Sequence, residues 1–176
     1  HTKLVHTTHG MEHLEESFKQ NLYEIFLGIA AQKIICVSEA FAGHYLSQPG
    51  TKKEKVELIE NGTPLGGSKK DDKEKLRVCS EFDLDPTKLV GVYVGRVCPM
   101  KGQLDLIKSF EREGKQLLIV GPPSDEEYYE KCAKASGDYV KMTGSREDVV
   151  NILKGCDFFV SNSLHEGLPI AALEAG

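Results

Sequence analysis

Two carboxylates near the end of the chain, Glu166 and Glu174, stand on either side of a predicted helix start. The apolar run Phe158–Val160 predicts a buried strand before them, and Pro169 favours a first helical turn. A helix N-terminus offers N–H groups and partial positive charge, which suit an anionic ligand. The carboxylates could line a ligand site, or they could be a solvated loop residue and a helix-surface residue. These residues alone leave both interpretations open.

Two cations, Arg96 and Lys101, follow another predicted strand, residues 89–94. Gly95 precedes the arginine, and Gly102 follows the lysine directly before a predicted helix. Glycine lets the backbone approach a ligand closely, the guanidinium offers a planar fork of donors, and the ammonium offers a compact charge. Two cations beside a helix start suit a diphosphate. The alternative is a pair of surface cations near a turn.

Glycines also end two further predicted strands. Gly121 begins the sequence Gly-Pro-Pro after residues 116–120, and Gly144 lies in Thr-Gly-Ser after residues 139–142. Either glycine could let the backbone border a nucleotide, or could be part of a turn.

The elements that carry these residues alternate regularly. Apolar strands are predicted at 89–94, 116–120, 139–142 and 157–160, and helices at 103–112, 125–135 and 147–153. Capping-box spacing predicts helix starts at Ser124 and Ser145. Such alternation is typical of a parallel sheet covered on both faces, a doubly wound α/β domain. Ligands of such sheets bind at the carboxyl ends of the strands, so the cations and carboxylates should share one cleft that suits a nucleotide-sugar.

The first part of the chain predicts further strands and helices. Strands are expected at 4–8, 33–37 and 56–59, the first closed by His9, and Ser38 should cap a helix that ends near residue 46. A longer helix after the first strand has one apolar face, which consists of Leu14, Phe18, Leu22, Ile25, Phe26 and Ile29.

A change of composition separates the two parts. Pro, Gly and Ser are frequent in residues 63–68, and the mixed charges of Lys69–Lys75 predict a solvated helix face. We therefore expect one domain over 1–62, a linker over 63–70 and a second domain over 71–176. Because the chain starts at His1 and stops soon after a helix start, we expect a fragment of a longer protein.

The composition is that of a soluble globular protein. The 176 residues are 40% hydrophobic, and 22 Lys and Arg against 27 Asp and Glu give a net charge of -5. This mild acidity argues against a non-specific nucleic-acid surface. No apolar stretch is long enough to span a bilayer, and no signal peptide is visible. The five scattered cysteines predict reduced, buried thiols in a cytosolic protein rather than disulfides or a zinc site.

Together these residues resemble the paired signatures of family-4 retaining glycosyltransferases, which are two-domain enzymes of the GT-B fold. One signature is Gly95-Arg96 with Pro99-x-Lys101-Gly102, and the other is Glu166-Gly167-Leu168-Pro169 with Glu174. Val37-Ser38 and Ile59-Glu60-Asn61-Gly62 are similar to less specific marks of the family. The resemblance runs from the last third of the acceptor-side domain through most of the donor-binding domain, and implies two Rossmann-like domains.

The resemblance implies roles for the matching residues of the donor side. Arg96 and Lys101 would hold the donor's diphosphate and steady the leaving group, and Glu174 would hydrogen-bond the ribose. Glu166 would face the transferred sugar.

It also implies further contacts to the donor. The N–H groups of Gly167 and Leu168 would be additional donors. His9 matches a histidine that family members direct at the sugar across the cleft, although it could equally be a histidine satisfied in a turn.

The implied reaction is transfer of a sugar from a nucleoside-diphosphate sugar to an acceptor hydroxyl with retention of anomeric configuration. The acceptor would be a sugar, a glycan or a lipid-linked glycan, in polysaccharide or glycoconjugate biosynthesis. Because no aspartate pair ends a strand, no metal and no cofactor are expected, and the nucleotide-sugar is a co-substrate. The expected location is cytoplasmic, with peripheral membrane attachment of the whole protein left open.

Two features depart from the family's pattern. Gly121-Pro122-Pro123 stands where Gly-x-Gly is common, and Gly176 replaces the usual methionine after Glu-Ala. Two alternatives remain: a nucleotide-sugar epimerase on the same fold, and a non-catalytic module that binds nucleotide or protein. We expect the fragment alone to bind nucleotide weakly and to transfer nothing.

Overall fold

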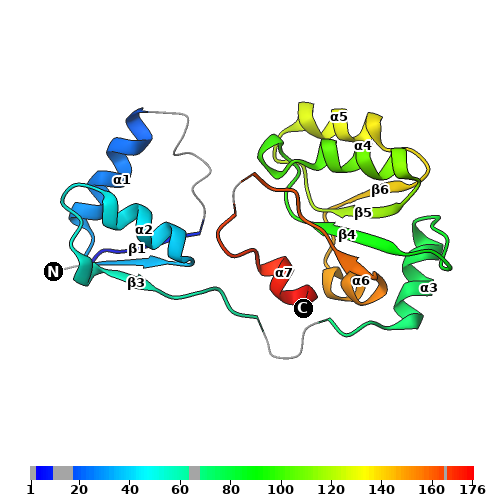
Figure 1. Cartoon of the computed structure of the whole chain (residues 1–176), viewed down its shortest axis with the longest axis horizontal. Coiled ribbons are helices and arrows are strands. Elements are labelled where there is room, and N and C mark those ends of the chain that lie inside the picture. The colour runs from blue at the N-terminus through cyan, green and yellow to red at the C-terminus, as the bar shows by residue number, and fades with distance from the viewer. Residues whose placement is uncertain (1–2, 10–17, 64–67, 165) are drawn as a thin grey trace. The chain divides into compact units, whose positions relative to one another are not determined.

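The computed structural model describes residues 3–9, 18–63, 68–164 and 166–176 (Figure 1). The chain divides into two compact units. The first comprises His1–Gly62 and His165–Pro169, and the second comprises Thr63–Leu164 and Ile170–Gly176. Each unit has its own sheet and its own apolar core.

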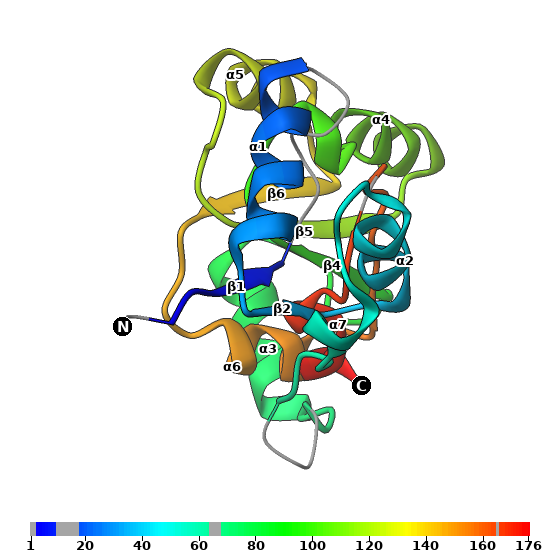
Figure 2. The same ribbon diagram turned by 90° about the vertical axis from the view of Figure 1, so that its left-hand side faces the viewer.

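The first unit is built on a three-stranded parallel sheet in the order β1-β2-β3. Figure 2 shows α1 and α2 beside the strands of this sheet. Each predicted strand is confirmed and is one residue shorter than expected. The elements are β1 (Val5–Thr8), α1 (Phe18–Ala30), β2 (Lys33–Cys36), α2 (Glu39–Ser47), the 3-10 turn η1 (Lys53–Lys55) and β3 (Val56–Leu58).

The core of this unit lies between α2 and β2. Ile34 and Cys36 are the buried positions of β2, and they pack with Phe41 and Tyr45 of α2. Ser38 caps α2 as predicted, because its hydroxyl oxygen accepts a hydrogen bond from the N–H of Phe41 at 3.4 Å.

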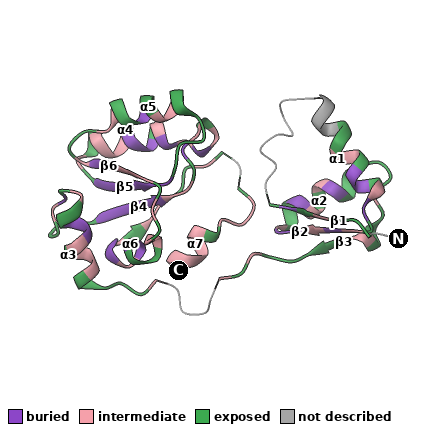
Figure 3. Ribbon diagram, turned by 180° about the vertical axis from the view of Figure 1, so that it is seen from behind, coloured by how far each residue is buried: buried purple, intermediate pink, exposed green. Residues whose placement is uncertain are grey.

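Most of the predicted apolar face of α1 is exposed among the residues whose side chains the structure describes (Figure 3). Leu22, Phe26 and Ile29 keep 58%, 62% and 54% of their surface accessible. The side chains of Leu14 and Phe18 lie outside the described part of the chain. Ile25 of this face is half-buried, and the buried Leu27 was not part of the predicted face, so helical spacing did not show which side of α1 packs inward.

The second unit contains a four-stranded parallel sheet in the order β6-β5-β4-β7. This confirms the predicted alternation of parallel strands and helices. The elements are α3 (Asp72–Glu81), β4 (Val90–Val94), the 3-10 turn η2 (Pro99–Lys101), α4 (Gln103–Glu113), β5 (Gln116–Val120), α5 (Glu126–Ala135), β6 (Val140–Gly144), α6 (Val149–Gly155), β7 (Phe158–Phe159) and α7 (Ile170–Ala175).

Helices cover both faces of this sheet, with α4 and α5 on one side and α3 and α6 on the other (Figures 1 and 3). Alternate residues of β5 enter different cores. Leu117 and Ile119 pack beneath α4 and α5, whereas Leu118 and Val120 pack beneath α3 and α6. Because both faces are covered, β5 is buried throughout and has a continuous apolar sequence.

Both predicted capping-box starts are wrong. Asp125, not Ser124, caps α5, and its carboxylate accepts a hydrogen bond from an N–H three residues later at 2.9 Å. The residue before α6 is Asp148 rather than Ser145, and it makes no capping hydrogen bond. Its carboxylate accepts instead from the guanidinium of Arg146 at 2.8 Å. The aspartate next to Ser124 was therefore the better guide to the start of α5, whereas α6 begins without a side-chain cap.

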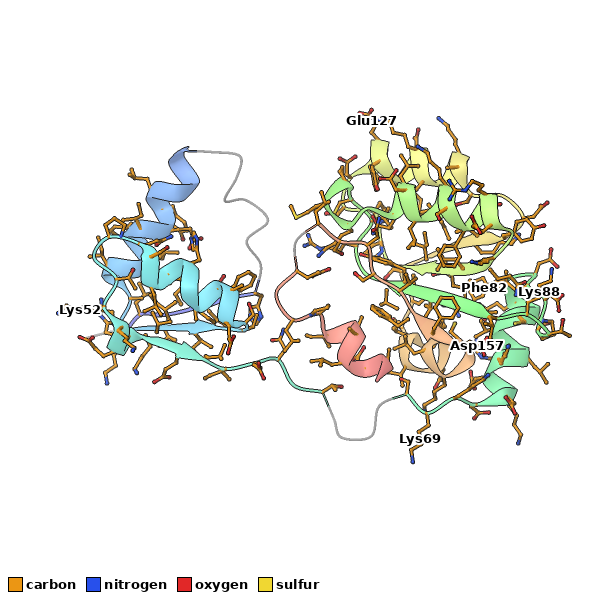
Figure 4. The ribbon with its side chains drawn as sticks, viewed as in Figure 1. Lys52, Lys69, Phe82, Lys88, Glu127 and Asp157 are labelled. Carbon is orange, nitrogen blue, oxygen red and sulfur yellow. The ribbon has the colours of Figure 1, made fainter. Side chains whose placement is uncertain are left out.

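The charge run after the predicted linker is only partly solvated. Lys70 and Lys75 donate to the two carboxylate oxygens of Asp157 at 2.5 Å and 2.8 Å. Asp157 is labelled in Figure 4. Asp157 also accepts from the N–H of Val90 at 2.9 Å, and its side chain is only 5% exposed. Burial raises the pKa of this carboxyl, but the hydrogen bonds outweigh burial and lower the pKa to about 2. This cluster ties α3 to the starts of β4 and β7.

Candidate functional site

The loops that follow β4 and β7 are hydrogen-bonded to each other. These two strands are parallel neighbours, so their carboxyl ends lie at the same edge of the sheet. The N–H of Leu164 donates to the carbonyl of Met100 at 2.9 Å, and the side-chain amide of Asn162 donates to the carbonyl of Gly102 at 3.2 Å. The turn that carries the predicted cations is therefore held against the loop that leads to the predicted carboxylates.

Arg96 leaves the end of β4 on a backbone that is fixed on both sides. The N–H of Gly95 donates to the carbonyl of Val120 at 2.9 Å, and the N–H of Val97 donates to the carbonyl of Pro122 at 2.9 Å. The arginine side chain is exposed. A donor-rich side chain thus starts from a backbone that is hydrogen-bonded on both sides.

Lys101 is a buried cation at the end of η2. Only 8% of its surface is exposed, so the alternative of two surface cations is wrong for this residue. The next residue must be glycine: Gly102 has a φ of 66°, and a Cβ there would lie 2.4 Å from the carbonyl oxygen of Asn162. The turn that carries the lysine can therefore fit closely against the loop after β7.

The N-terminus of α4 directly follows this turn. Gly102 is the cap residue and supplies no side chain, while the N–H of Leu104 donates to the hydroxyl of Tyr128 at 2.9 Å. The first turn of a helix carries partial positive charge. Together with Arg96 and Lys101, the start of α4 gives the carboxyl end of β4 a positive potential suited to an anion.

Gly121 and Gly144 shape the neighbouring strand ends. A Cβ at Gly121 would lie 2.0 Å from the carbonyl oxygen of Gly95, so only glycine lets the two loops pass. The N–H of Gly121 donates to the carbonyl of Gly144 at 2.9 Å. Gly144 has a φ of 69°, a conformation that favours glycine. The close approach of two loops explains the glycine at 121, and the backbone conformation explains the glycine at 144. Their contact with a nucleotide stays a prediction.

Glu174 lies on α7 in the second unit, the same unit as Arg96 and Lys101. This short helix packs against α6 and β7, and Ala175 contacts the core beneath α3 and α6. Glu174 is half-buried. Its helix is therefore anchored to the strand that borders β4.

Glu166, Gly167 and Leu168 lie in a segment whose contacts group it with the first unit. A Cβ at Gly167 would lie 2.7 Å from the ring of Phe41, so the glycine allows close packing against α2. The carbonyl of Leu168 accepts a hydrogen bond from the side-chain amide of Asn61 at 2.8 Å. Glu166 is exposed. The two residues that follow Glu166 thus hold this segment to the first unit.

His9 follows β1 in the first unit and is exposed. Among the described residues, no three His, Cys, Asp or Glu side chains are grouped so that they could hold a metal ion. No helix within the described ranges has the length and apolar character needed to cross a membrane. Four cysteines are buried, and burial raises the pKa of each of their thiols: Cys36, Cys79, Cys132 and Cys156.

The sequence did not reveal the amide side chains that hold this region together. Gln103 is fully buried and donates to the carbonyl of Arg96 at 2.8 Å. The sequence predicts a turn at Asn61, but it does not predict the hydrogen bond from Asn61 to Leu168, which lies 107 residues later. The only signal was the polar Gln103 at a position where the apolar face of a helix begins.

Two curated relatives match almost the whole chain. The chain is 29% identical to the UDP-Gal:alpha-D-GlcNAc-diphosphoundecaprenol alpha-1,3-galactosyltransferase of Escherichia coli, over 98% of this chain and 48% of the relative. It is 23% identical to the N,N'-diacetylbacillosaminyl-diphospho-undecaprenol alpha-1,3-N-acetylgalactosaminyltransferase of Campylobacter jejuni, over 94% of this chain and 47% of the relative. The chain therefore spans about half the length of these relatives.

Among solved structures, the chain is similar to the crystal structure of Anabaena Alr3699/HepE in complex with UDP and glucose. The TM-score is 0.85 at 19% sequence identity, over 98% of this chain and 50% of that one. At this identity the likeness shows the fold alone. It confirms the predicted α/β architecture of GT-B type, with Rossmann-like parallel sheets.

A family match covers the second unit together with the segment that contains Glu166. Residues 69–176, more than half of the chain, match the family described as Glycosyl transferases group 1. The matched range contains Arg96, Lys101 and Glu174 as well as Glu166. The chain therefore belongs to the glycosyl transferases group 1 family.

Proposed function

We propose that the chain comprises the end of the acceptor-side domain and most of the donor-binding domain of a retaining glycosyltransferase of the family-4 type. The whole protein would transfer a sugar from a nucleoside-diphosphate sugar to an acceptor hydroxyl with retention of anomeric configuration. One observation carries this proposal: the turn with Arg96 and the buried Lys101 is hydrogen-bonded, through Met100 and Gly102, to the loop after β7. That loop leads to Glu166 and Glu174.

Arg96 and Lys101 are the proposed diphosphate ligands. Negative charge builds on the leaving nucleoside diphosphate as the bond to the sugar breaks. Cations fixed in place before the reaction stabilise that charge without reorganisation during the step. The acceptor hydroxyl attacks the face from which the nucleotide leaves, and the donor phosphate takes its proton. Because two side-chain cations supply the countercharge, we propose that the reaction needs neither a metal nor another cofactor.

The other predicted residues surround the same donor in this proposal. Glu174 accepts hydrogen bonds from the ribose, and Glu166 accepts them from the transferred sugar. The N–H groups of Gly167 and Leu168 are further donors, and His9 acts on the sugar from the acceptor side.

The glycines complete the proposed nucleotide site. Gly95, Gly121 and Gly144 lie at the carboxyl ends of three neighbouring strands, β4, β5 and β6. There they would let the backbone border the nucleotide closely.

The domain assignment is part of the proposal. Residues 1–62 would belong to an acceptor-side domain, 63–70 to the linker and 71–176 to the donor-binding domain. Because the relatives are about twice as long as this chain, we propose that the acceptor is chosen mainly by residues outside it. The isolated chain should bind nucleotide weakly and transfer nothing, and the whole protein should act in the cytoplasm.

The names of the two relatives indicate which substrates to test first. One name includes UDP-Gal as donor, and both include an undecaprenol-linked diphosphate sugar. We therefore propose a UDP-hexose as donor and a lipid-linked glycan as acceptor for the whole protein that carries this chain.

The test incubates that whole protein with UDP-hexoses, with and without a lipid-linked acceptor. Proton NMR identifies the product and its anomeric configuration early in the reaction. A new glycosidic bond with the donor's configuration supports the proposal, and activity should persist in EDTA. An epimerised donor formed without acceptor indicates the epimerase alternative. Nucleotide binding without turnover indicates a non-catalytic module.

A further inference from the structure

Gln103 is a polar side chain in the apolar face of α4. It is fully buried together with Leu106 and Ile107, at the spacing of one helix face. Its amide nitrogen donates a hydrogen bond to the carbonyl oxygen of Arg96 at 2.8 Å. Its amide oxygen is buried and accepts no hydrogen bond from the residues that the structure describes.

A glutamine at this position is costly for packing alone. Burial of an amide costs free energy unless its hydrogen bonds are replaced, and here the oxygen has no partner in the described part of the chain. Methionine or leucine would fill a similar volume without that cost. The hydrogen bond to Arg96 is therefore the feature of Gln103 that an apolar residue could not reproduce.

This hydrogen bond fixes the peptide group between Arg96 and Val97 at its second end: its carbonyl accepts from Gln103, and its N–H donates to the carbonyl of Pro122. The preceding N–H, from Gly95, is bonded to β5, and the following N–H, from Val97, is bonded to the loop after β5. Gly121 lies directly beneath the carbonyl of Gly95. The carbonyl of Arg96 accepts its hydrogen bond from α4, through the side chain of Gln103.

We infer that Gln103 is a positioning residue that fixes the direction in which Arg96 leaves the sheet. The inference rests on the proposed function, in which Arg96 binds the donor's diphosphate. A side chain that starts from a fixed backbone loses less freedom when it binds, so binding is tighter. Because Gln103 is also the first residue of α4, it links the arginine to the helix N-terminus that faces the same anion.

The test measures UDP binding by calorimetry and thermal unfolding in the whole protein that carries this chain. Gln103→Met removes the donor but keeps the volume, so UDP should bind about fivefold more weakly. The unfolding temperature should change little, because the variant removes a buried unpaired oxygen but also leaves the carbonyl of Arg96 without its donor. A merely structural role would lower stability and affinity together. Leu106→Met is the matched control in the same face and should change neither quantity.

A double-mutant cycle tests whether the effect passes through Arg96. Arg96→Ala should weaken UDP binding about thirtyfold, and Gln103→Met should add nothing in that background. An equal fivefold loss in both backgrounds, or wild-type affinity of Gln103→Met, overturns the inference. If Arg96→Ala binds UDP normally, the proposed phosphate site fails and the inference fails with it. Gln103→Leu repeats the cycle if the methionine variant does not fold.

Discussion

The cluster around Asp157 should make the stability of the second unit depend on pH. The ordinary pKa of this carboxyl is 3.8. Burial raises the pKa, but hydrogen bonds from Lys70, Lys75 and the N–H of Val90 lower it further, to about 2 in the folded state. This lowering of the pKa corresponds to about 2 kcal/mol of stability for the folded state. Because the folded-state pKa is the lower one, this contribution is complete above about pH 5 and decreases as the pH falls toward 2.

Asp157→Asn removes the ionisable group and keeps one acceptor oxygen. At pH 7 the variant should be about 2 kcal/mol less stable than the wild type, and near pH 3 the difference should shrink to about 1 kcal/mol. Urea denaturation followed by circular dichroism at both pH values measures the difference. Asp72→Asn, an exposed aspartate of α3, is the control and should cost well under 1 kcal/mol. The reasoning is refuted if the Asp157→Asn difference is the same at pH 7 and pH 3.

Two further substitutions test how the loops are held. Gly121→Ala places a Cβ 2.0 Å from the carbonyl oxygen of Gly95, so it should cost roughly 1–3 kcal/mol in urea denaturation and weaken UDP binding; a wild-type unfolding curve would contradict this. Asn162→Ala removes the amide hydrogen bond to the turn of Lys101, so UDP affinity should fall about threefold in calorimetry, with a stability loss below about 1 kcal/mol. Unchanged affinity would show that the turn keeps its place without Asn162.

The fold was predictable because burial on two faces leaves a clear trace in the sequence. The strand Gln116–Val120 was predicted with the bounds that the structure has, since every residue of β5 is buried. The two predicted starts were wrong because the aspartate next to Ser124 caps α5 in its place, and because Asp148, the residue before α6, makes no capping hydrogen bond. Asp125 caps α5, whereas Asp148 is drawn to Arg146. Whether an aspartate caps a helix or binds a nearby arginine depends on the surrounding side chains, which a pattern of capping residues does not take into account.

Parts of the candidate site could be predicted for a similar reason. Arg96 and Lys101 were found because charged residues at strand ends are visible in the sequence, yet the near-complete burial of the lysine was not. Gln103 was missed because a glutamine in a first helical turn is ordinary in sequence. Asn162 was missed because its partner, Gly102, lies 60 residues away. Hydrogen bonds over such separations depend on which strands become neighbours.

The central claim is that Arg96 and Lys101 stabilise the leaving diphosphate of a nucleotide-sugar. The most direct measurement is kcat for sugar transfer by the whole protein, with Lys101→Ala compared with Lys108→Ala. Lys108 is an exposed cation on α4 and is the matched control for the change of net charge. The proposal predicts that Lys101→Ala lowers kcat about 100-fold or more, whereas Lys108→Ala leaves it unchanged. Equal kcat values for the two variants would contradict the claim.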